Sequence, residues 1–413
     1  MGRIGPVFIF EDEKYENFLP LVWLRPVFDL RVGILTIFEK WYKKLGDIEG
    51  VFLRSYLSKL IKEMHPGIRV NEGIRPGMKV LLINGRALPP QDISIFEDVE
   101  EETLFVNNKG EVVAFYGYFD EYEGMIDTGR LREKGVKESQ IDAEVFNYLW
   151  DTIKINGEEI IKDFNMIGNS GIHAPISQKV TLLGNEIFVA EGVRLYPNVV
   201  IDAEEGPVYI DKNVTVLPNA FLKGPLYVGE GSIIKVGAKI YEDVSIGSIC
   251  KVGGELEATI IHSYSNKQHD GFLGHSYVGS WVNIGADTNT SNLRNNYGSV
   301  KIIFKGERFD TGMQFLGSMI GDHTKSGINT MFNTGTIVGV FSNIFDAGFL
   351  PKFIPSFSWG GRHGFVTHEL EKAIATARRV MKRRKVELGP SYEEVIRKVF
   401  ELTQKERDEA GMS

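Results

Sequence analysis

The sequence has one cysteine in 413 residues, Cys250, so no disulfide can form within the chain. It also lacks an excess of positive charge, because 47 lysines and arginines stand against 55 acidic residues and give a net charge of −8. Nucleic-acid binding needs a basic surface that neutralises phosphates, so this balance argues against a nucleic-acid partner. A single free thiol fits a reducing compartment, and we expect a cytoplasmic protein in which Cys250 is a buried structural thiol.

Long hydrophobic runs are absent as well. The most apolar candidate, "LPLVWLRPVFDLRVGILTIF", is interrupted by Arg25, Asp29 and Arg31, and no run reaches the length that spans a bilayer. The first residues, "MGRIGPVFIFEDEKY", have no apolar core long enough for a signal peptide. The sequence therefore predicts no membrane association.

Glycine, in contrast, is abundant, with 45 residues concentrated in the second half of the chain. In the same half, aliphatic residues, and in two places phenylalanine, recur every six positions. A fixed period of six fits neither a helix nor an isolated strand and indicates a parallel β-helix. The repeat runs through Ile210, Val216, Leu222, Val228, Ile234, Ile240, Ile246 and Val252, slips by two, and resumes at Phe272, Val278 and Ile284. It returns at Ile320, Phe332, Val338 and Ile344, with Ser326 as the polar exception.

The chain is too long for one ordinary core. Residues 1–165 read as a mixed α/β domain, residues 166–350 as the β-helix, and residues 351–413 as an irregular aromatic crossing followed by two helices. The expected fold is therefore an N-terminal α/β domain, a parallel β-helix and C-terminal helices.

The stretch "KQHDGFLGHSYVGSWVNIGADT" (267–288) resembles the hexapeptide-repeat acyltransferases. Within them it is most similar to the bifunctional N-acetylglucosamine-1-phosphate uridyltransferase and glucosamine-1-phosphate acetyltransferase family, in its divergent bacterial form. The resemblance implies a left-handed β-helix with three hexapeptides per turn, acetyl-CoA as co-substrate, and a homotrimer with active sites between neighbouring shafts.

Two histidines lie in this stretch. Histidine suits proton transfer near neutral pH, and the resemblance implies that His269 is the catalytic general base. His275 follows Leu273 and Gly274 and reads as a turn residue. A zinc site of the carbonic anhydrase type would need three convergent imidazoles, whereas residues six apart lie on adjacent faces and point in different directions.

The resemblance also implies residues that bind the acceptor sugar phosphate. Asn283 matches an asparagine that contacts the sugar, and Lys235 stands where the family has a phosphate-binding arginine. Phe272 replaces a tyrosine that contacts the sugar phosphate, so a hydroxyl is missing. Lys301 corresponds to a lysine that follows the active-site loop. Phosphate recognition is thus expected to be rebuilt, or the acceptor to differ.

For acetyl-CoA, the resemblance implies Ala286, where the acetyl-CoA arm runs close to the backbone, and Asn292, which opens the loop after "GADT". Leu293 replaces the tyrosine that follows this asparagine in the family. The basic stretch "ARRVMKRRK" (377–385) has two readings, a contact with the 3′-phosphate of CoA or a solvated helix face.

In the N-terminal half, "NFLPLVWLRPVFDL" resembles sugar-phosphate nucleotidyltransferases. This implies that Arg25 and Arg31 bind nucleotide phosphates and that Asp29 binds Mg²⁺. However, Val27 stands where a lysine belongs and Arg86 where the Mg²⁺-binding aspartate belongs. Two alternatives remain open: a divergent uridyltransferase that uses UTP and Mg²⁺, or a degenerate domain kept for stability or substrate binding.

Together these patterns predict acetyl-CoA-dependent N-acetylation of an amino-sugar 1-phosphate such as glucosamine 1-phosphate. If the N-terminal domain is active, a coupled uridylyl transfer gives UDP-N-acetylglucosamine. The alternative is a sugar-phosphate nucleotidyltransferase whose β-helix is a non-catalytic trimerisation or regulatory module. His269 within its motif favours the first reading, since a purely structural shaft needs no histidine there.

Overall fold

A computed structural model describes residues 5–97, 99–119 and 124–412, which form two compact units. The first unit comprises Met1–Arg31, Leu35–Asp151 and Pro390–Lys398, and the second comprises Val32–Ile34, Thr152–Gly389 and Val399–Ser413. The first unit thus ends its main run at Asp151, not at the expected residue 165. Among the described residues no helix is both long and apolar enough to cross a bilayer.

The first unit is built on a seven-stranded sheet with the order β3-β2-β1-β4-β6-β5-β7. β1 to β4 are parallel, and β6 runs antiparallel to both β4 and β5. This confirms the expected α/β domain. The strands are β1 (Val7–Phe10), β2 (Gly50–Phe52), β3 (Arg69–Val70), β4 (Lys79–Asn84), β5 (Thr103–Val106), β6 (Val112–Tyr118) and β7 (Lys137–Gln140).

Short helices connect these strands. α1 (Ile37–Leu45) begins at a capping box, in which the Thr36 hydroxyl accepts from the Glu39 amide and the Glu39 carboxylate accepts from the Thr36 amide. The other helices of this unit are α2 (Ser58–Met64), α3 (Thr128–Glu133) and the 3₁₀ turns η1 (Glu13–Phe18), η2 (Val27–Asp29), η3 (Ser55–Leu57) and η4 (Ser94–Phe96).

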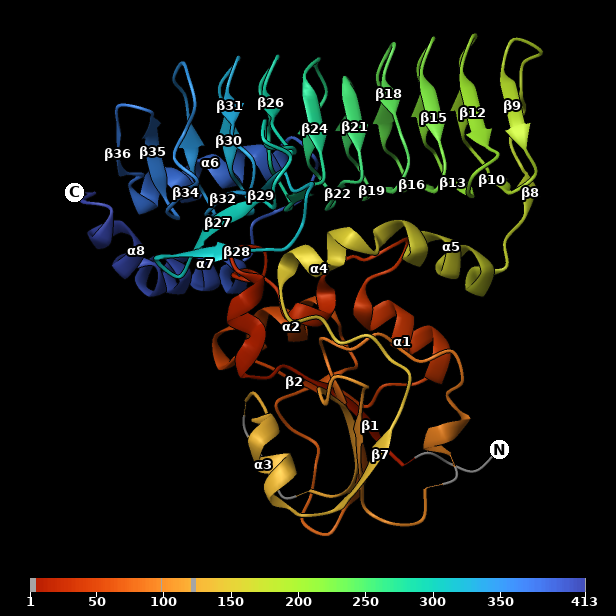
Figure 1. Cartoon of the computed structure of the whole chain (residues 1–413), viewed down its shortest axis with the longest axis vertical. Coiled ribbons are helices and arrows are strands. Elements are labelled where there is room, and N and C mark those ends of the chain that lie inside the picture. Colours follow the sequence, from red (N-terminus) through yellow and green to blue (C-terminus); the bar gives the residue numbers. More distant parts are fainter. Residues whose placement is uncertain (1–4, 98, 120–123, 413) are drawn as a thin grey trace. The chain divides into compact units, whose positions relative to one another are not determined.

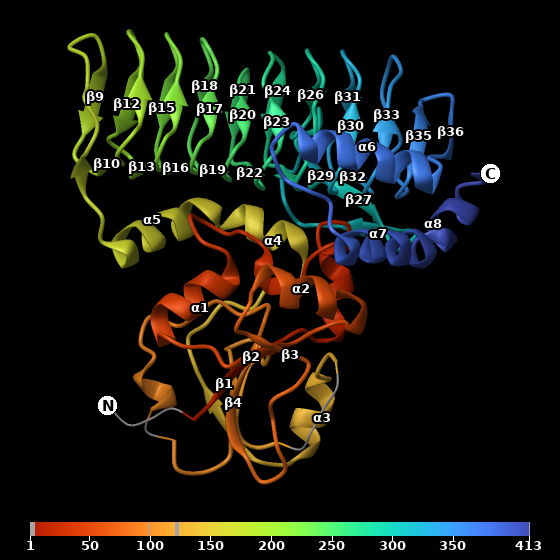
Figure 2. The same ribbon diagram turned by 180° about the vertical axis from the view of Figure 1, so that it is seen from behind.

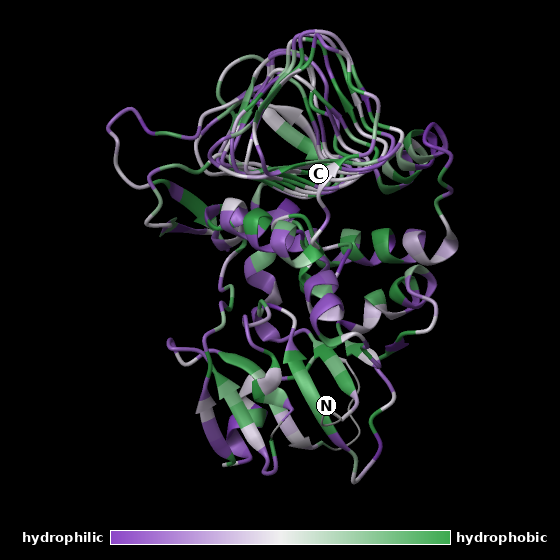
Figure 3. Ribbon diagram, turned by 90° about the vertical axis from the view of Figure 1, so that its right-hand side faces the viewer, coloured by the Kyte–Doolittle hydropathy of each residue, from purple (hydrophilic) through white to green (hydrophobic). Residues whose placement is uncertain are grey.

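The second unit is a left-handed parallel β-helix whose coils form a row of parallel strands (Figure 1) and enclose a triangular shaft (Figure 3). We call its sides the first, second and third faces. The first face contains β8 (Gly171–Ile172), β10 (Ile187–Val189), β13 (Val208–Ile210), β16 (Leu226–Val228), β19 (Val244–Ile246), β22 (Ile260–Ile261), β25 (Tyr277–Val278), β29 (Ser318–Ile320), β32 (Thr336–Val338) and β34 (Phe353–Ile354).

The other two faces follow the same coils. The second face contains β11 (Arg194–Leu195), β14 (Thr215–Val216), β17 (Ile233–Ile234), β20 (Lys251–Val252), β23 (Asn266–Lys267), β30 (Lys325–Ser326), β33 (Asn343–Ile344), β35 (Ser358–Gly361) and the antiparallel β36 (Gly364–Thr367). The third face contains β9 (Thr181–Gly184), β12 (Val200–Ala203), β15 (Phe221–Lys223), β18 (Lys239–Ile240), β21 (Glu255–Glu257), β24 (Phe272–Gly274), β26 (Asn289–Thr290) and β31 (Met331–Phe332).

The hexapeptide ladder fills the shaft as predicted, since every member from Ile210 to Val252 is fully buried. The prediction is wrong at Phe272. Leu273 is the inward residue there, paired with the buried Leu256, while Phe272 is partly exposed opposite Glu255. The slip is taken up in the two shortened turns after Val252, since the next inward residues are Leu256 and Ile261.

The shaft also extends beyond residue 350, because β34 and β35 add strands to its first and second faces and β36 closes the end. The "irregular crossing" expected from residue 351 is therefore largely regular. One excursion leaves the shaft as the hairpin β27 (Lys301–Phe304) and β28 (Glu307–Asp310).

Helices complete the second unit. α5 (Asn156–Ile167) follows α4 (Leu149–Lys154) and packs on the shaft, where the Asn156 amide donates to Asp243 O at 2.8 Å and Gly157 leaves room for the Asp243 side chain. α6 (Leu370–Lys382) runs across β30 and β33 (Figure 2). α8 (Gln404–Glu409) also belongs to the second unit, whereas most of α7 (Pro390–Leu402) belongs to the first.

Candidate functional site

His269 lies on the corner between the second and third faces, after β23 and before β24, and its side chain is exposed. Asn266 bridges Asn283 in the next coil, and the Asp287 amide donates to Asp270 O at 3.0 Å. This register places Ala286 at the same corner, one coil beyond His269. The structure thus brings His269, the predicted base, close to Ala286, the predicted contact of the acetyl donor.

Directly beneath this corner, a lysine occupies the interior of the shaft. Lys267 takes the inward position that Val252 holds in the preceding coil, and it is 2% exposed. Its ammonium donates to the backbone oxygens of His269 and of Asp270, the latter at 3.2 Å. Burial lowers the pKa of Lys267 to about 8. Lys267 therefore fixes the backbone of the His269 corner from inside.

On the second face, beside the corner, lies a cavity of about 340 Å³. Asn283 and Gln268, the residue before His269, are both in its wall. A set of cations also lines it, Lys251 and Lys325 from the shaft and Arg383 and Arg384 after α6. The complete lining is Lys251, Tyr264, Asn266, Gln268, Trp281, Asn283, Lys325, Val380, Arg383 and Arg384.

Lys235 stands at the same edge, two coils before Gln268, with Gly253 between them. A Cβ on Gly253 would lie 2.8 Å from Gln268 O and 2.9 Å from Lys235 Cβ, so only glycine fits this approach. Burial, together with Arg384, Lys235 and Arg383, lowers the pKa of Lys251. The predicted phosphate-binding Lys235 thus belongs to a larger cationic region.

Phe272 and Asn292 meet on the third face. A Cβ on Gly274 would lie 2.4 Å from Phe272 Cζ and 2.8 Å from Asn292 Nδ2, so both side chains lie over this glycine. The Phe272 amide donates to Asn289 Oδ1 at 2.8 Å. Phe272 and Asn292 are therefore on a different side of the His269 corner from Asn283.

His275 belongs to this third-face group and not to the His269 corner. Its backbone has φ +46°, as expected for a turn residue, and its Nδ1 is 3.0 Å from Asn292 Nδ2. The ring stacks on Phe315 with centroids 5.1 Å apart, and burial lowers its pKa to about 4. The described residues contain no group of three histidine, cysteine or acidic side chains that could hold a metal.

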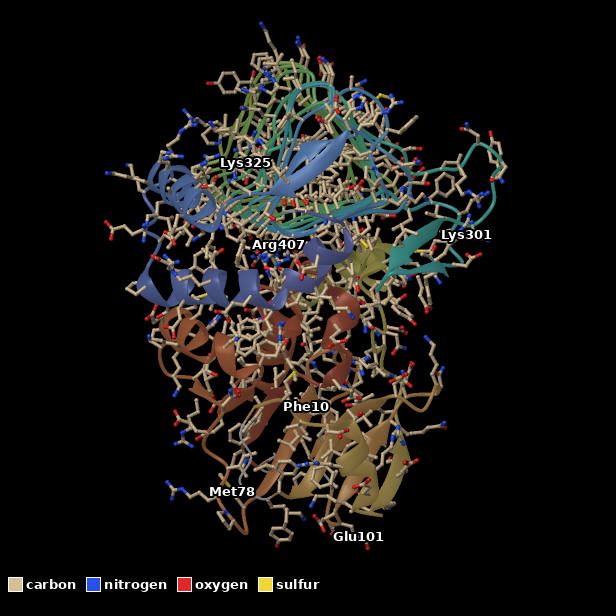
Figure 4. The ribbon with its side chains drawn as sticks, turned by 90° about the vertical axis from the view of Figure 1, so that its left-hand side faces the viewer. Phe10, Met78, Glu101, Lys301, Lys325 and Arg407 are labelled. Atoms are coloured by element: carbon tan, nitrogen blue, oxygen red, sulfur yellow. The ribbon has the colours of Figure 1, made fainter. Side chains whose placement is uncertain are left out.

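Lys301 is not brought to the cavity. It lies in β27, where its ammonium is 3.6 Å from Asp310 Oδ2. Figure 4, a view along the shaft, places Lys301 and Lys325 on opposite sides. Cys250, in contrast, is buried in the shaft as predicted, with its Sγ 3.3 Å from His262 O.

In the first unit, Asp29 ends η2, and burial raises its pKa to about 7 although Arg25 opposes the shift. Arg25 and Asp29 are thus close enough to interact. The backbone of Arg31 forms an antiparallel β-bridge with Thr36. No cluster of three acidic, histidine or cysteine ligands surrounds Asp29 within the described ranges.

Ligands of open α/β sheets bind outside the carboxyl ends of the parallel strands. Here the ends of β1 and β4 are joined by a buried ion pair. Arg86 Nε donates to the two carboxylate oxygens of Asp12 at 2.8 and 2.9 Å, and the two side chains are 1% and 0% exposed. Asn84 also donates to Asp12 at 3.0 Å.

A second pair stands at the end of β2, where Arg54 Nη2 donates to Glu11 Oε1 at 3.0 Å and both groups are buried. A guanidinium at position 86 repels Mg²⁺, and both carboxylate oxygens of Asp12 already accept hydrogen bonds from it. The Mg²⁺ site that the resemblance implies therefore does not fit this edge of the sheet.

Sequence comparison identifies relatives of both units. Residues 7–170 match the family model for sugar nucleotidyl transferases. A bifunctional sugar-1-phosphate nucleotidylyltransferase/acetyltransferase of Sulfurisphaera tokodaii is 34% identical over 97 residues, 23% of this chain and 24% of the relative. The bifunctional protein GlmU of Methanococcus aeolicus is 24% identical over 324 residues, 71% of this chain and 73% of the relative. With the first of these relatives, the chain shares only about a quarter of the relative's length.

Among solved structures, a UDP-N-acetylglucosamine acyltransferase of Arabidopsis aligns with 51% of this chain and 80% of its own. Its identity is 15% and the TM-score is 0.25, too low to support a functional comparison.

Sequence reasoning did not assign Lys267, Arg383 and Arg384 to the site. Lys267 carried no signal, because position 267 does not fall on the six-residue ladder that the sequence shows. For the two arginines, the basic stretch 377–385 was the available signal, but the sequence alone leaves both of its readings open.

Proposed function

Because this chain carries a sugar nucleotidyl transferase domain and is related to the bifunctional sugar-1-phosphate nucleotidylyltransferase/acetyltransferases, we propose that it is a transferase that N-acetylates an amino-sugar 1-phosphate with acetyl-CoA. The observation that carries the proposal is the corner at which exposed His269 stands between the cationic cavity and Ala286. Glucosamine 1-phosphate is the proposed acceptor, in the cytoplasm.

In the proposed reaction, the neutral His269 imidazole takes a proton from the acceptor amine as its nitrogen attacks the thioester carbonyl. The nitrogen–carbon bond forms, the carbon–sulfur bond breaks, and CoA leaves as the thiolate. Asn283 orients the sugar, and Lys235 contacts its phosphate. Ala286 and Asn292 line the path of the acetyl donor. Phe272, the substrate-binding position at which a hydroxyl is missing, lies beside Asn292 on the third face.

We further propose that the active molecule is a homotrimer. Exposed apolar side chains surround the corner and the third face: Ile328 is 69% exposed, Phe349 56% and Met331 38%. Ile328 follows Ala286 in the next coil, since Asn329 N donates to Ala286 O at 2.8 Å. A neighbouring shaft would cover these side chains.

A second candidate function is sugar-phosphate nucleotidyl transfer with a non-catalytic shaft. The family match of residues 7–170 favours it, whereas the buried Asp12–Arg86 pair opposes the usual Mg²⁺-dependent arrangement. Purified protein should therefore be incubated with acetyl-CoA, glucosamine 1-phosphate, UTP and Mg²⁺ and the products analysed by mass spectrometry. We expect N-acetylglucosamine 1-phosphate. UDP-glucosamine without any acetylated product would support the second candidate and contradict the first.

The role of Lys267 can be tested by Lys267→Met. A methionine of similar length fills the shaft without a buried charge, so we expect the stability to be unchanged or higher. The corner loses its two internal hydrogen bonds, and we expect kcat for acetyl transfer to fall about 10-fold with little change in KM, because misplacing a base slows chemistry more than binding. Thermal unfolding and steady-state kinetics measure both. A variant with normal kcat would show that Lys267 does not position the corner.

A further inference from the structure

The cavity on the second face has an unusual charge. Lys251, Lys325, Arg383 and Arg384 line it, and none of its described lining residues is acidic. In the described part of the chain none of these four cations forms an ion pair, whereas Lys212 and Lys239, elsewhere on the shaft, pair with Glu191 and Glu255. Like charges gathered without carboxylates repel one another, and a bound anion would relieve that repulsion.

Burial strengthens this argument for the two lysines. Lys325 lines the cavity, its Nζ donates to His323 O at 2.8 Å, and burial lowers its pKa to about 8. The pKa of Lys251 is also lowered, by burial first and then by Arg384, Lys235 and Arg383. Both ammonium groups therefore stand in surroundings that an anion would stabilise.

The arginines are held in place by α6. The helix buries Ala373, Ile374, Ala377 and Met381. At its end Arg384 Nη2 donates to Asn266 Oδ1 at 2.7 Å, 118 residues away in sequence. This contact holds the Arg384 guanidinium over the wall that contains Asn266 and Asn283. A planar guanidinium binds two phosphate oxygens at once, which an ammonium cannot do.

We propose that this cavity is a binding site for a phosphomonoester dianion, in which Arg383 and Arg384 of the C-terminal segment complete the site that Lys251 and Lys325 begin. The choice of ligand rests on the proposed function, and two sources share this chemistry. One is the phosphate of the sugar 1-phosphate acceptor, and the other is the 3′-phosphate of CoA. The amides of Asn266, Gln268 and Asn283 in the same wall offer donors and acceptors to either ligand.

Isothermal titration calorimetry on the full chain, at a fixed ionic strength of about 0.15 M, tests the site without requiring turnover. The ligands are glucosamine 1-phosphate, glucosamine, inorganic phosphate, CoA and dephospho-CoA. Arg383→Gln, Arg384→Gln and Lys251→Gln are each expected to weaken the phosphate-bearing ligand by about 10- to 100-fold, the range for a hydrogen bond to a charged group. Arg379→Gln is the matched control, because Arg379 is exposed on the same helix, donates to Thr376, and is absent from the lining.

If the acceptor is the ligand, the loss appears with glucosamine 1-phosphate and inorganic phosphate but not with glucosamine. If CoA is the ligand, it appears with CoA and not with dephospho-CoA. The site is overturned if all three variants bind every phosphate ligand with wild-type affinity, or if the wild type binds no phosphate ligand. Lost phosphate binding in a protein that never forms acetylated product leaves the site standing and removes the proposed function. If the protein forms acetylated product but the variants bind phosphate ligands as the wild type does, the proposed function stands and the phosphate site is removed.

Discussion

Replacing His269 by alanine is expected to slow acetyl transfer by about 10²- to 10⁴-fold, the usual contribution of a positioned general base. This corresponds to about 3–5 kcal/mol of transition-state stabilisation. The side chain is exposed at a corner, so its removal should leave the fold intact. Binding of acetyl-CoA should persist, because we assign that contact to Ala286 and Asn292. Single-turnover acetyl transfer and calorimetric acetyl-CoA binding measure the two effects separately.

His275→Ala is the matched control, six residues away. Its ring is hydrogen-bonded to Asn292 and stacked on Phe315, so it lies on the third face with Phe272 and Asn292. Burial lowers the pKa of His275 to about 4, so the ring is already neutral at about pH 6 and cannot cause a change of rate near neutrality. We expect a loss of less than about 10-fold. The assignment of the base is wrong if His275→Ala abolishes transfer while His269→Ala does not.

The shaft could be predicted from the sequence because its side chains repeat with a fixed period, and the buried run from Ile210 to Val252 follows that period. The period fails at Phe272 for a local reason. Phe272 and Leu273 are both apolar, so the pattern alone does not tell which one points inward. Pairing with Leu256 decides it, and this depends on the short turn that begins at Gly253 and Gly254.

The cationic cavity could not be predicted in the same way. Arg384 reaches Asn266 only because α6 folds back across the shaft, and no spacing in the sequence encodes that contact. Lys267 is similar, since a lysine normally indicates a surface position. Its burial becomes intelligible only when the backbone oxygens of His269 and Asp270 are seen to accept from it.

Arg86 was recognised in the sequence as a departure from the nucleotidyltransferase pattern, but its partner was not. Asp12 is 74 residues away, at the end of the neighbouring parallel strand. The sheet brings the two together, and Arg86 also donates to Phe146 O. The pattern therefore located the unusual residue, and the topology shows that its charge is balanced inside the domain.

The Asp12–Arg86 pair allows the second large effect to be predicted. Asp12→Asn keeps the size of the side chain but removes the buried counter-charge of the Arg86 guanidinium and leaves only the partly exposed Glu111 carboxylate, 3.8 Å away. Breaking a buried ion pair in this way typically costs about 3–5 kcal/mol. We expect a loss of this size in the free energy of unfolding of the first unit. The measurement is urea unfolding followed by tryptophan fluorescence in a Trp281→Phe, Trp359→Phe background. In that background the remaining tryptophans, Trp23, Trp41 and Trp150, all belong to the first unit. Glu13→Gln, at the exposed neighbouring acid, is the control and should cost less than about 0.5 kcal/mol.

A double variant separates the two readings of the N-terminal domain. If the pair is structural, Asp12→Asn combined with Arg86→Met should recover much of the lost stability, because no uncompensated charge remains. If Asp12 instead serves nucleotidyl transfer as a Mg²⁺ ligand, Asp12→Asn should leave the unfolding free energy nearly unchanged and abolish the transfer. A stable Asp12→Asn protein would thus contradict the structural role and revive a metal-dependent uridyltransferase at this edge of the sheet.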